Sequence, residues 1–163
     1  MPASLEGPAR NVPEPVLPAL AKEESLEGAQ AFLDYWSDAM WFAYQTGDTS
    51  YARDIISPHC EICMDQLALI DGAYEDGAWF IGGRESPIIQ SKELILSTDG
   101  TYKPVVVASA EGVQLVEGGK VTYEAEPRSG KGDPFPVYLD FTDSSWIYIT
   151  AANLAGAGAS NAT

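Results

Sequence analysis

Apolar residues at helical spacing mark the first part of the chain. From Leu26 onward they recur every three or four positions and so occupy one face of a helix, which Ser25 can cap and Gly47 can end. A shorter helical pattern covers residues 51–56, and a third covers residues 60–77. The pattern therefore predicts three helices in the first half of the chain. The apolar face of the first consists of Ala29, Phe32, Leu33, Trp36, Met40 and Ala43.

The pattern changes to that of β-strands after Gly77. Segments rich in Val, Ile and Tyr alternate with turns that contain Gly or Pro. Three connections, residues 110–112, 117–120 and 142–144, are short enough for hairpins. Because helices come first and strands follow, the order favours an α+β fold, with helices packed on a curved antiparallel sheet, over an alternating parallel α/β fold. The expected strands are residues 78–82, 87–97, 104–109, 112–117, 121–126, 136–142 and 145–152.

Both ends of the chain differ from this region in composition. Residues 1–24 are rich in proline, which interrupts helices, and contain few large apolar groups to bury. The end of the chain consists almost entirely of small and polar residues, which order poorly without packing from elsewhere. We expect a Pro-rich disordered linker over residues 1–24, a single domain over residues 25–153 and a flexible tail over residues 154–163.

The net charge of −15 over 163 residues excludes some partners. A protein this acidic repels the phosphates of nucleic acids and anionic membrane surfaces. The sequence also lacks any run near the ~20 consecutive apolar residues of a membrane-spanning helix. We therefore expect no nucleic-acid partner, and a solvated acidic surface that keeps the domain soluble.

Cys60 and Cys63 form a Cys-x-x-Cys motif near the start of the third helical pattern. Residues at this spacing can approach within disulfide distance, and a structural disulfide requires nothing further from the chain. Free thiols in a reducing compartment are the next interpretation. A redox centre lacks the expected preceding strand, and a zinc site lacks ligands, since His59 is the one further candidate nearby.

Motifs for catalysis are absent from the sequence. His59 is the single histidine, and its position next to Cys60 does not generally bring the two side chains together. We find no Gly-x-Ser-x-Gly elbow, no calcium-loop spacing and no glycine-rich phosphate loop. The sequence therefore predicts no catalytic residue, no metal site and no cofactor.

Aromatic residues are numerous enough to line a cavity for an apolar ligand, although core packing is the simpler account. Asp140 is the acidic candidate. It shares a strand face with Tyr138 and Thr142, and the alternate residues take the other face. If the Asp140 face lined a cavity, burial would raise the pKa of Asp140 and make it a candidate base; we favour a face turned to water. The cavity candidates are Trp36, Met40, Tyr44, Trp79, Tyr123, Tyr138, Asp140 and Trp146.

Two resemblances follow from these segments. The order of helices and long strands resembles the nuclear transport factor 2-like (cystatin-like cone) architecture. Over about residues 25–150, several segments resemble an actinobacterial lipoprotein family, domain of unknown function 6318. These segments are EGAQAF at 27–32, YQTGDT at 44–49, SPHCEIC at 57–63, and YEDG at 74–77 followed by Gly82-Gly83.

The resemblance implies export and a lipid anchor on a cysteine upstream of this chain, with residues 1–24 as a spacer between membrane and domain. It also implies an extracellular, cell-surface location. An oxidising location favours a disulfide between Cys60 and Cys63. No activity is attached to the family, and the cone fold hosts both enzymes and binding modules.

The function that we expect is that of a non-enzymatic extracytoplasmic binding domain. Its partner would be an unknown protein or a small apolar ligand, bound in a cone-shaped cavity or on the open sheet face, and a homodimer through that face is a further expectation. The alternative is a small-molecule isomerase or dehydratase that uses Asp140 with Tyr123 or Tyr138. A third interpretation is a thiol–disulfide protein that uses the Cys60–Cys63 pair.

Overall fold

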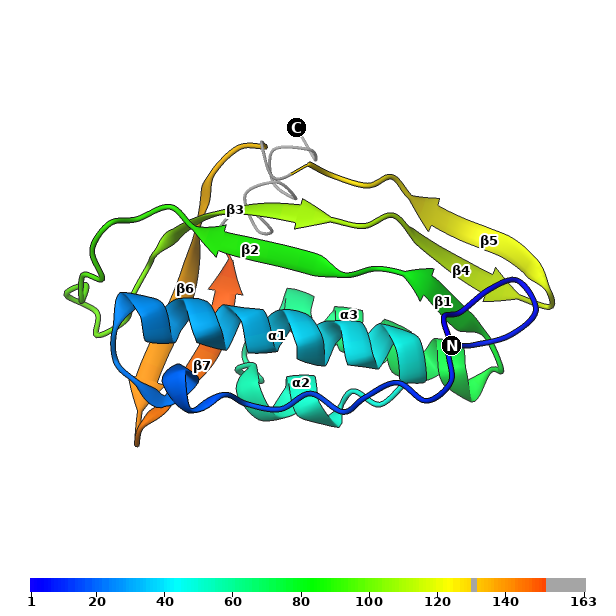
Figure 1. Ribbon diagram of the computed structural model, residues 1–163, viewed down its shortest axis with the longest axis horizontal. Coiled ribbons are helices and arrows are strands. Elements are labelled where there is room, and N and C mark those ends of the chain that lie inside the picture. The colour runs from blue at the N-terminus through cyan, green and yellow to red at the C-terminus, as the bar shows by residue number, and fades with distance from the viewer. Residues whose placement is uncertain (130–131, 152–163) are drawn as a thin grey trace.

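The computed structural model describes residues 1–129 and 132–151 of the chain. In this part, three helices precede seven antiparallel strands (Figure 1). The fold is therefore α+β, as the order of patterns predicted. The helices are α1 (Leu26–Thr46), α2 (Ser50–Ile55) and α3 (Glu61–Glu75), and a short 3₁₀ helix, η1 (Ala19–Lys22), comes before them. The strands are β1 (Trp79–Gly82), β2 (Glu85–Ile89), β3 (Val105–Ala110), β4 (Val113–Glu117), β5 (Lys120–Ala125), β6 (Phe135–Thr142) and β7 (Ser145–Ala151).

Helix α1 begins and ends where its sequence signals indicate. The Ser25 hydroxyl accepts a hydrogen bond from the Gly28 amide at 2.9 Å. Gly47 ends the helix in the left-handed conformation, at φ 80°, which a residue with a side chain rarely adopts. The apolar face expected from the spacing is buried along its whole length. The predictions for this helix are confirmed.

The strands form a curled antiparallel sheet, a half-barrel, in two parts. One part has the order β1-β4-β5 and the other the order β2-β3-β6-β7. Two tight hairpins join neighbours, β4 to β5 and β6 to β7. Their turn residues have positive φ, at Gly118-Gly119 and at Asp143-Ser144, as such two-residue turns require. Both hairpins were predicted.

The third expected hairpin, at residues 110–112, is wrong. Strand β3 pairs with β2 and β6, whereas β4 pairs with β1 and β5, so the connection is a bend between two strands that follow one another. A matching bend lies at Gly82-Gly83 between β1 and β2. The backbones meet there: the Gly83 amide donates to the Gly112 carbonyl at 3.1 Å, and a Cβ on Gly82 would collide with that same oxygen. Glycine is required because the two bends touch.

The expected strand 87–97 is too long. Its ladder with β3 ends at Ile89, and beyond it the Ser91 hydroxyl accepts the Val105 amide in place of a backbone carbonyl. The chain then passes through exposed Ile95 and Leu96 to the turn at residues 97–100. Leu94 packs against the core, but Ile95 and Leu96 do not have the burial that the run of apolar residues suggested.

Helix α1 covers the edge formed by β1 and β2, and Figure 1 shows it running along both strands. Polar side chains of α1 donate hydrogen bonds to backbone carbonyls of β1 and β2. Gln45 donates to the Gly82 carbonyl at 2.9 Å, and Ser37 donates to the Glu85 carbonyl at 2.5 Å. These bonds satisfy backbone groups that an edge strand would leave without a partner, and they hold Glu85 in place.

Residues 1–24, expected as a linker, contain η1. Ala21 is buried in the main core, and the Glu23 carbonyl accepts a hydrogen bond from the Trp146 indole at 3.0 Å. The helix follows Pro18, a residue that can precede a helix without losing a hydrogen bond. The expected tail, residues 154–163, lies outside the described residues. The boundaries of the folded domain stay a prediction.

Candidate ligand cavity

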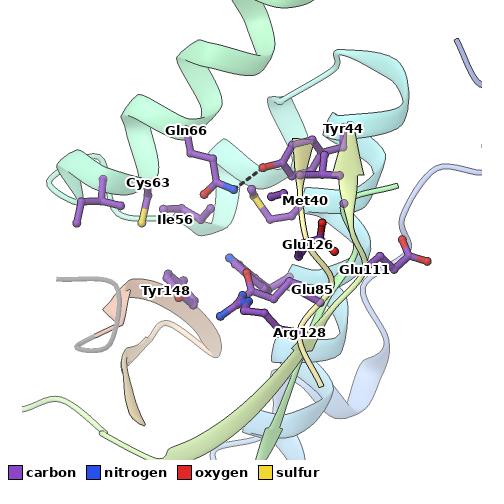
Figure 2. Close-up of a pocket in the computed structure, with 16 residues that line it drawn as sticks. Met40, Tyr44, Ile56, Cys63, Gln66, Glu85, Glu111, Glu126, Arg128 and Tyr148 are labelled. Atoms are coloured by element: carbon purple, nitrogen blue, oxygen red, sulfur yellow. Dashed lines mark hydrogen bonds and ion pairs between the residues drawn. The ribbon is translucent and has the colours of Figure 1, made fainter. Parts of the chain in front are cut away.

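A cavity of about 340 Å³ lies between α1, α3 and the bent strands (Figure 2). Buried residues form its floor and exposed residues form its mouth. The floor contains Trp36 and Met40 from α1, Ile56 after α2, and Tyr148 from β7. The other lining residues are Tyr44, Ile62, Cys63, Gln66, Gly83, Glu85, Ala110, Glu111, Val113, Ala125, Glu126 and Arg128.

Two stacked aromatic rings make up the centre of the floor. The rings of Trp36 and Tyr148 lie 5.1 Å apart, at an interplanar angle of 10°. Burial raises the pKa of the Tyr148 phenol, and the nearby Glu85 carboxylate raises it further. The Trp36 indole N–H is buried and has no hydrogen-bond partner among the described residues. A buried donor without a partner costs free energy, so packing alone does not explain a tryptophan at this position.

Helix α3 forms one wall. Cys63 and Gln66 lie one turn apart on the cavity side, and the Gln66 amide donates to the Tyr44 hydroxyl at 2.7 Å. Burial raises the pKa of Tyr44, although the hydrogen bond from Gln66 acts in the opposite direction. Tyr44 therefore stays protonated at neutral pH, with a hydroxyl hydrogen available to donate.

The Cys60 and Cys63 sulfur atoms are 2.07 Å apart, at disulfide-bonding distance. The expected pairing of the motif agrees with this geometry. Cys60 is also the N-cap of α3, and both side chains are buried. The pair therefore fixes the first turn of the helix that carries Ile62 and Gln66 to the cavity.

Charged side chains gather at the mouth. The Arg128 guanidinium donates to the Glu85 carboxylate at 3.0 Å. The Glu111 carboxylate accepts the Arg84 amide at 3.1 Å, and Figure 2 shows that side chain pointing away from the cavity. Glu126 lines the mouth without an ion-pair partner among the described residues. The described residues at the mouth therefore carry more negative than positive charge.

The bend in the sheet brings the mouth residues together. Arg128 follows β5, and its backbone exchanges two hydrogen bonds of 2.9 Å with Ala110 at the end of β3. Ala110 and Arg128, which β4 and β5 separate in sequence, thus meet beside Glu85 at the start of β2. The charged set depends on the bend between β3 and β4.

Three of the eight cavity candidates from the sequence line this cavity: Trp36, Met40 and Tyr44. All three lie on α1, and Trp36 and Met40 belong to the apolar face that the spacing predicted. The other five candidates lie elsewhere, for two reasons: the strand or loop context turns the side chain outward, or the side chain is surrounded on all sides.

Trp146 is surrounded on all sides. It is 2% exposed, and Tyr102 and Phe141 contact its ring edge-on. Trp79 is half-buried and donates its indole N–H to the Ser4 carbonyl at 2.7 Å. Tyr123 is 57% exposed on β5. None of the three contributes to the cavity lining.

Tyr138 and Asp140 lie on the outer face of β6, as the alternation indicated. The ammonium of Lys103 lies 5.2 Å from the centre of the Tyr138 ring, and the Asp140 carboxylate accepts a hydrogen bond from the Thr142 hydroxyl at 3.1 Å. The inner positions Val137 and Leu139 are buried. The residues named for the isomerase or dehydratase alternative therefore do not meet in this cavity.

Sequence reasoning missed most of the polar lining. Tyr148 had a detectable signal, since it alternates with Trp146 on the apolar face of one strand. Glu85, Arg128 and Gln66 had none, because each is one polar residue among many until the fold brings them together. Among the described residues no group of three or more His, Cys, Asp or Glu side chains could hold a metal ion, and none of the described helices is long and apolar enough to cross a membrane.

Comparison with known proteins places the chain in a family. The family of unknown function DUF6318 matches residues 1–152. The chain belongs to the DUF6318 family. No curated protein matches the chain. The DUF6318 match includes every residue that lines the cavity, from Trp36 to Tyr148, and it also includes the N-terminal segment with η1.

Proposed function

We propose that this DUF6318 protein is a non-enzymatic binding domain that holds a small, largely apolar ligand in the cavity between α1, α3 and the bent strands. The observation that carries the proposal is the cavity itself, at about 340 Å³. Small-molecule sites usually measure about 300–1,000 Å³ and combine an apolar lining with a few polar groups. This cavity has that composition.

The chemistry of the lining supports binding over catalysis. Its floor is apolar or aromatic, and the hydroxyl of the partly buried Tyr44 and the buried Trp36 indole N–H are hydrogen-bond donors that orient a ligand. Among the described residues, the buried floor contains no carboxylate, and one of the carboxylates at the mouth, that of Glu85, is already paired with Arg128. A general base needs a free acceptor within reach of substrate, so Glu85 is poorly suited to that role.

The proposal includes a location. The domain belongs to an exported, actinobacterial lipoprotein, anchored at the cell surface through an upstream cysteine, with a nuclear transport factor 2-like cone as its fold. The disulfide-distance pair Cys60–Cys63 supports an oxidising compartment, where such bonds persist. Labelling the full-length precursor with radioactive palmitate tests the anchor, and a precursor that stays unlabelled and intracellular contradicts this part.

Assembly is a separate element of the proposal. The domain forms a homodimer through the sheet face, as is common for small soluble domains. Sedimentation velocity over a range of concentrations measures the mass in solution. A monomer at the highest concentration contradicts the dimer and leaves the binding proposal intact.

The test of ligand binding uses octanol, an apolar chain with one hydroxyl group. Isothermal titration calorimetry on the oxidised protein is expected to show saturable binding at one site. Ala110 lines the cavity, and Ala110→Leu adds apolar volume inside it, so this variant is expected to lose the binding.

The matched control is Ala68→Leu, the same substitution on an exposed position of α3 outside the cavity lining. It is expected to bind octanol as the wild type does. Equal binding by the wild type and Ala110→Leu would refute the cavity as the site, and circular dichroism of both variants verifies that the fold is retained.

A further inference from the structure

The charges at the mouth of the cavity bear on which ligand it accepts. Of the residues that the structure describes, four charged ones line the cavity: Glu85, Glu111, Glu126 and Arg128. Arg128 is the cation of this set, and its guanidinium is already paired with Glu85 at 3.0 Å. The Glu85–Arg128 pair has no net charge, and the Glu111 side chain points away from the cavity in Figure 2. Glu126 remains as an exposed carboxylate at the mouth without a counter-charge among the described residues.

A negative charge also acts on the tyrosines inside the cavity. Glu85 acts on both cavity tyrosines: in addition to burial, its carboxylate raises the pKa of Tyr148, and it also raises that of Tyr44 against the opposing hydrogen bond from Gln66. A negative charge stabilises the protonated form of a neighbouring phenol. The Glu85 carboxylate therefore acts on both phenols even though it is paired with Arg128.

An anionic ligand would be repelled at three levels. It would meet the field of a chain of net charge −15, then the Glu126 carboxylate at the mouth, and then the Glu85 carboxylate, which acts on the phenols of Tyr44 and Tyr148. A ligand with a positive head would gain at each of them. Its apolar part would contact Met40, Ile62 and the stacked rings of Trp36 and Tyr148, whose faces also attract cations.

We propose that the ligand of this cavity is a small amphipathic amine, with its ammonium group beside Glu126 at the mouth and its apolar body on the Trp36–Tyr148 floor. This inference rests on the proposed function, because it assigns the ligand class of the same cavity. The cavity then selects among apolar ligands by their charge.

The experiment compares three probes that share an eight-carbon chain: octylammonium, octanol and octanoate. Calorimetry at neutral pH and low salt, below the concentrations at which micelles form, gives a dissociation constant for each. Exposed ion pairs contribute modestly, so octylammonium is expected to bind about two- to fivefold more tightly than octanol, and octanoate more weakly than octanol by a similar factor. Added salt should reduce both differences.

Glu126→Gln removes the carboxylate at the mouth and keeps the shape of the side chain. It is expected to reduce the preference for octylammonium over octanol and to leave octanol binding unchanged. The matched control is Glu124→Gln on β5, two residues away, which removes the same charge from an exposed carboxylate outside the cavity lining. It is expected to retain the preference.

The outcomes separate the two proposals. If octanol binds but octanoate binds as tightly as octylammonium, the amine is refuted and the cavity remains a binding site. If the two glutamine variants lose the preference equally, the general field of the protein is responsible, and the assignment of Glu126 is overturned. If none of the probes binds the wild type, the proposed function fails, and the ligand class fails with it.

Discussion

Two tryptophans of one core cluster, Trp146 and Trp36, have surroundings that are built differently. Trp146 is 2% exposed, Tyr102 and Phe141 contact its edges, and its indole N–H donates to the Glu23 carbonyl. Trp36 is 6% exposed, but it borders the cavity and its indole N–H has no partner among the described residues. The surroundings of Trp146 are filled and its indole N–H is satisfied within the chain, whereas Trp36 borders a space and keeps a donor without a partner among the described residues. Burial alone therefore does not distinguish a structural tryptophan from one in a binding site. The difference is whether its indole N–H has a hydrogen-bond partner.

The comparison predicts the largest effect on stability for a substitution of Trp146. Trp146→Ala is expected to lower the free energy of unfolding by about 3–5 kcal/mol, because it leaves a large void among well-packed neighbours. Urea denaturation followed by circular dichroism measures the change. Tyr123→Ala, at the 57% exposed position on β5, is the control and should change stability by about 0.5 kcal/mol or less. A similar loss in both variants would contradict the comparison.

Reduction of the Cys60–Cys63 pair is expected to have the next largest effect. Closing so short a loop restricts the unfolded chain modestly, so reduction should cost about 2 kcal/mol. Urea denaturation with and without reductant measures it. Octanol affinity is expected to fall in parallel, since the pair fixes the first turn of α3, which lines the cavity. Unchanged affinity after verified reduction would show that this turn holds without the bond.

Alkaline pH is expected to lower the free energy of unfolding through Tyr148, which lies on the cavity floor. Its pKa is raised above the ordinary value of 10.0, mainly by burial, so above pH 10 the unfolded chain loses a proton that the folded chain keeps. Deprotonation therefore favours unfolding, by up to about 1.4 kcal/mol for each pH unit, and has no effect well below pH 10.

The Tyr148→Phe variant isolates this contribution. Tyr74, whose pKa burial raises to about 12, titrates in both proteins and cancels from the comparison. The stability advantage of the wild type over Tyr148→Phe should shrink as the pH rises through 10, as measured by urea denaturation at several pH values. A constant difference at all pH values would contradict the buried environment of the phenol.

The smallest expected change in stability comes from the mouth. Arg128→Gln breaks a partly exposed ion pair and should change the free energy of unfolding by about 1 kcal/mol or less. It leaves Glu85 without its counter-charge, so the preference for octylammonium over octanol should increase by about twofold. A variant that loses stability while its preference for octylammonium stays unchanged would show that Arg128 has a structural role only.

Local patterns predicted the helices and the tight hairpins. The Ser25 cap, the Gly47 end and the inward face of α1 each depend on neighbours within a few residues, and so does the alternation that turned Asp140 outward. The connection at residues 110–112 was misinterpreted because a glycine-containing turn and a bend between successive strands have the same local sequence. Only the contact between Gly82 and Gly112, thirty positions apart, distinguishes them.

The sequence by itself determined the α+β class, the three helices, the acidic surface and the spacing that allows Cys60 and Cys63 to pair, because each depends on composition or on contacts between near neighbours. Tertiary structure decided where the cavity lies and which residues line it. Trp36, Glu85, Arg128 and Tyr148 come from four separate segments. They meet because the sheet bends at two touching glycines, and such long-range contacts leave no periodic signal in the chain.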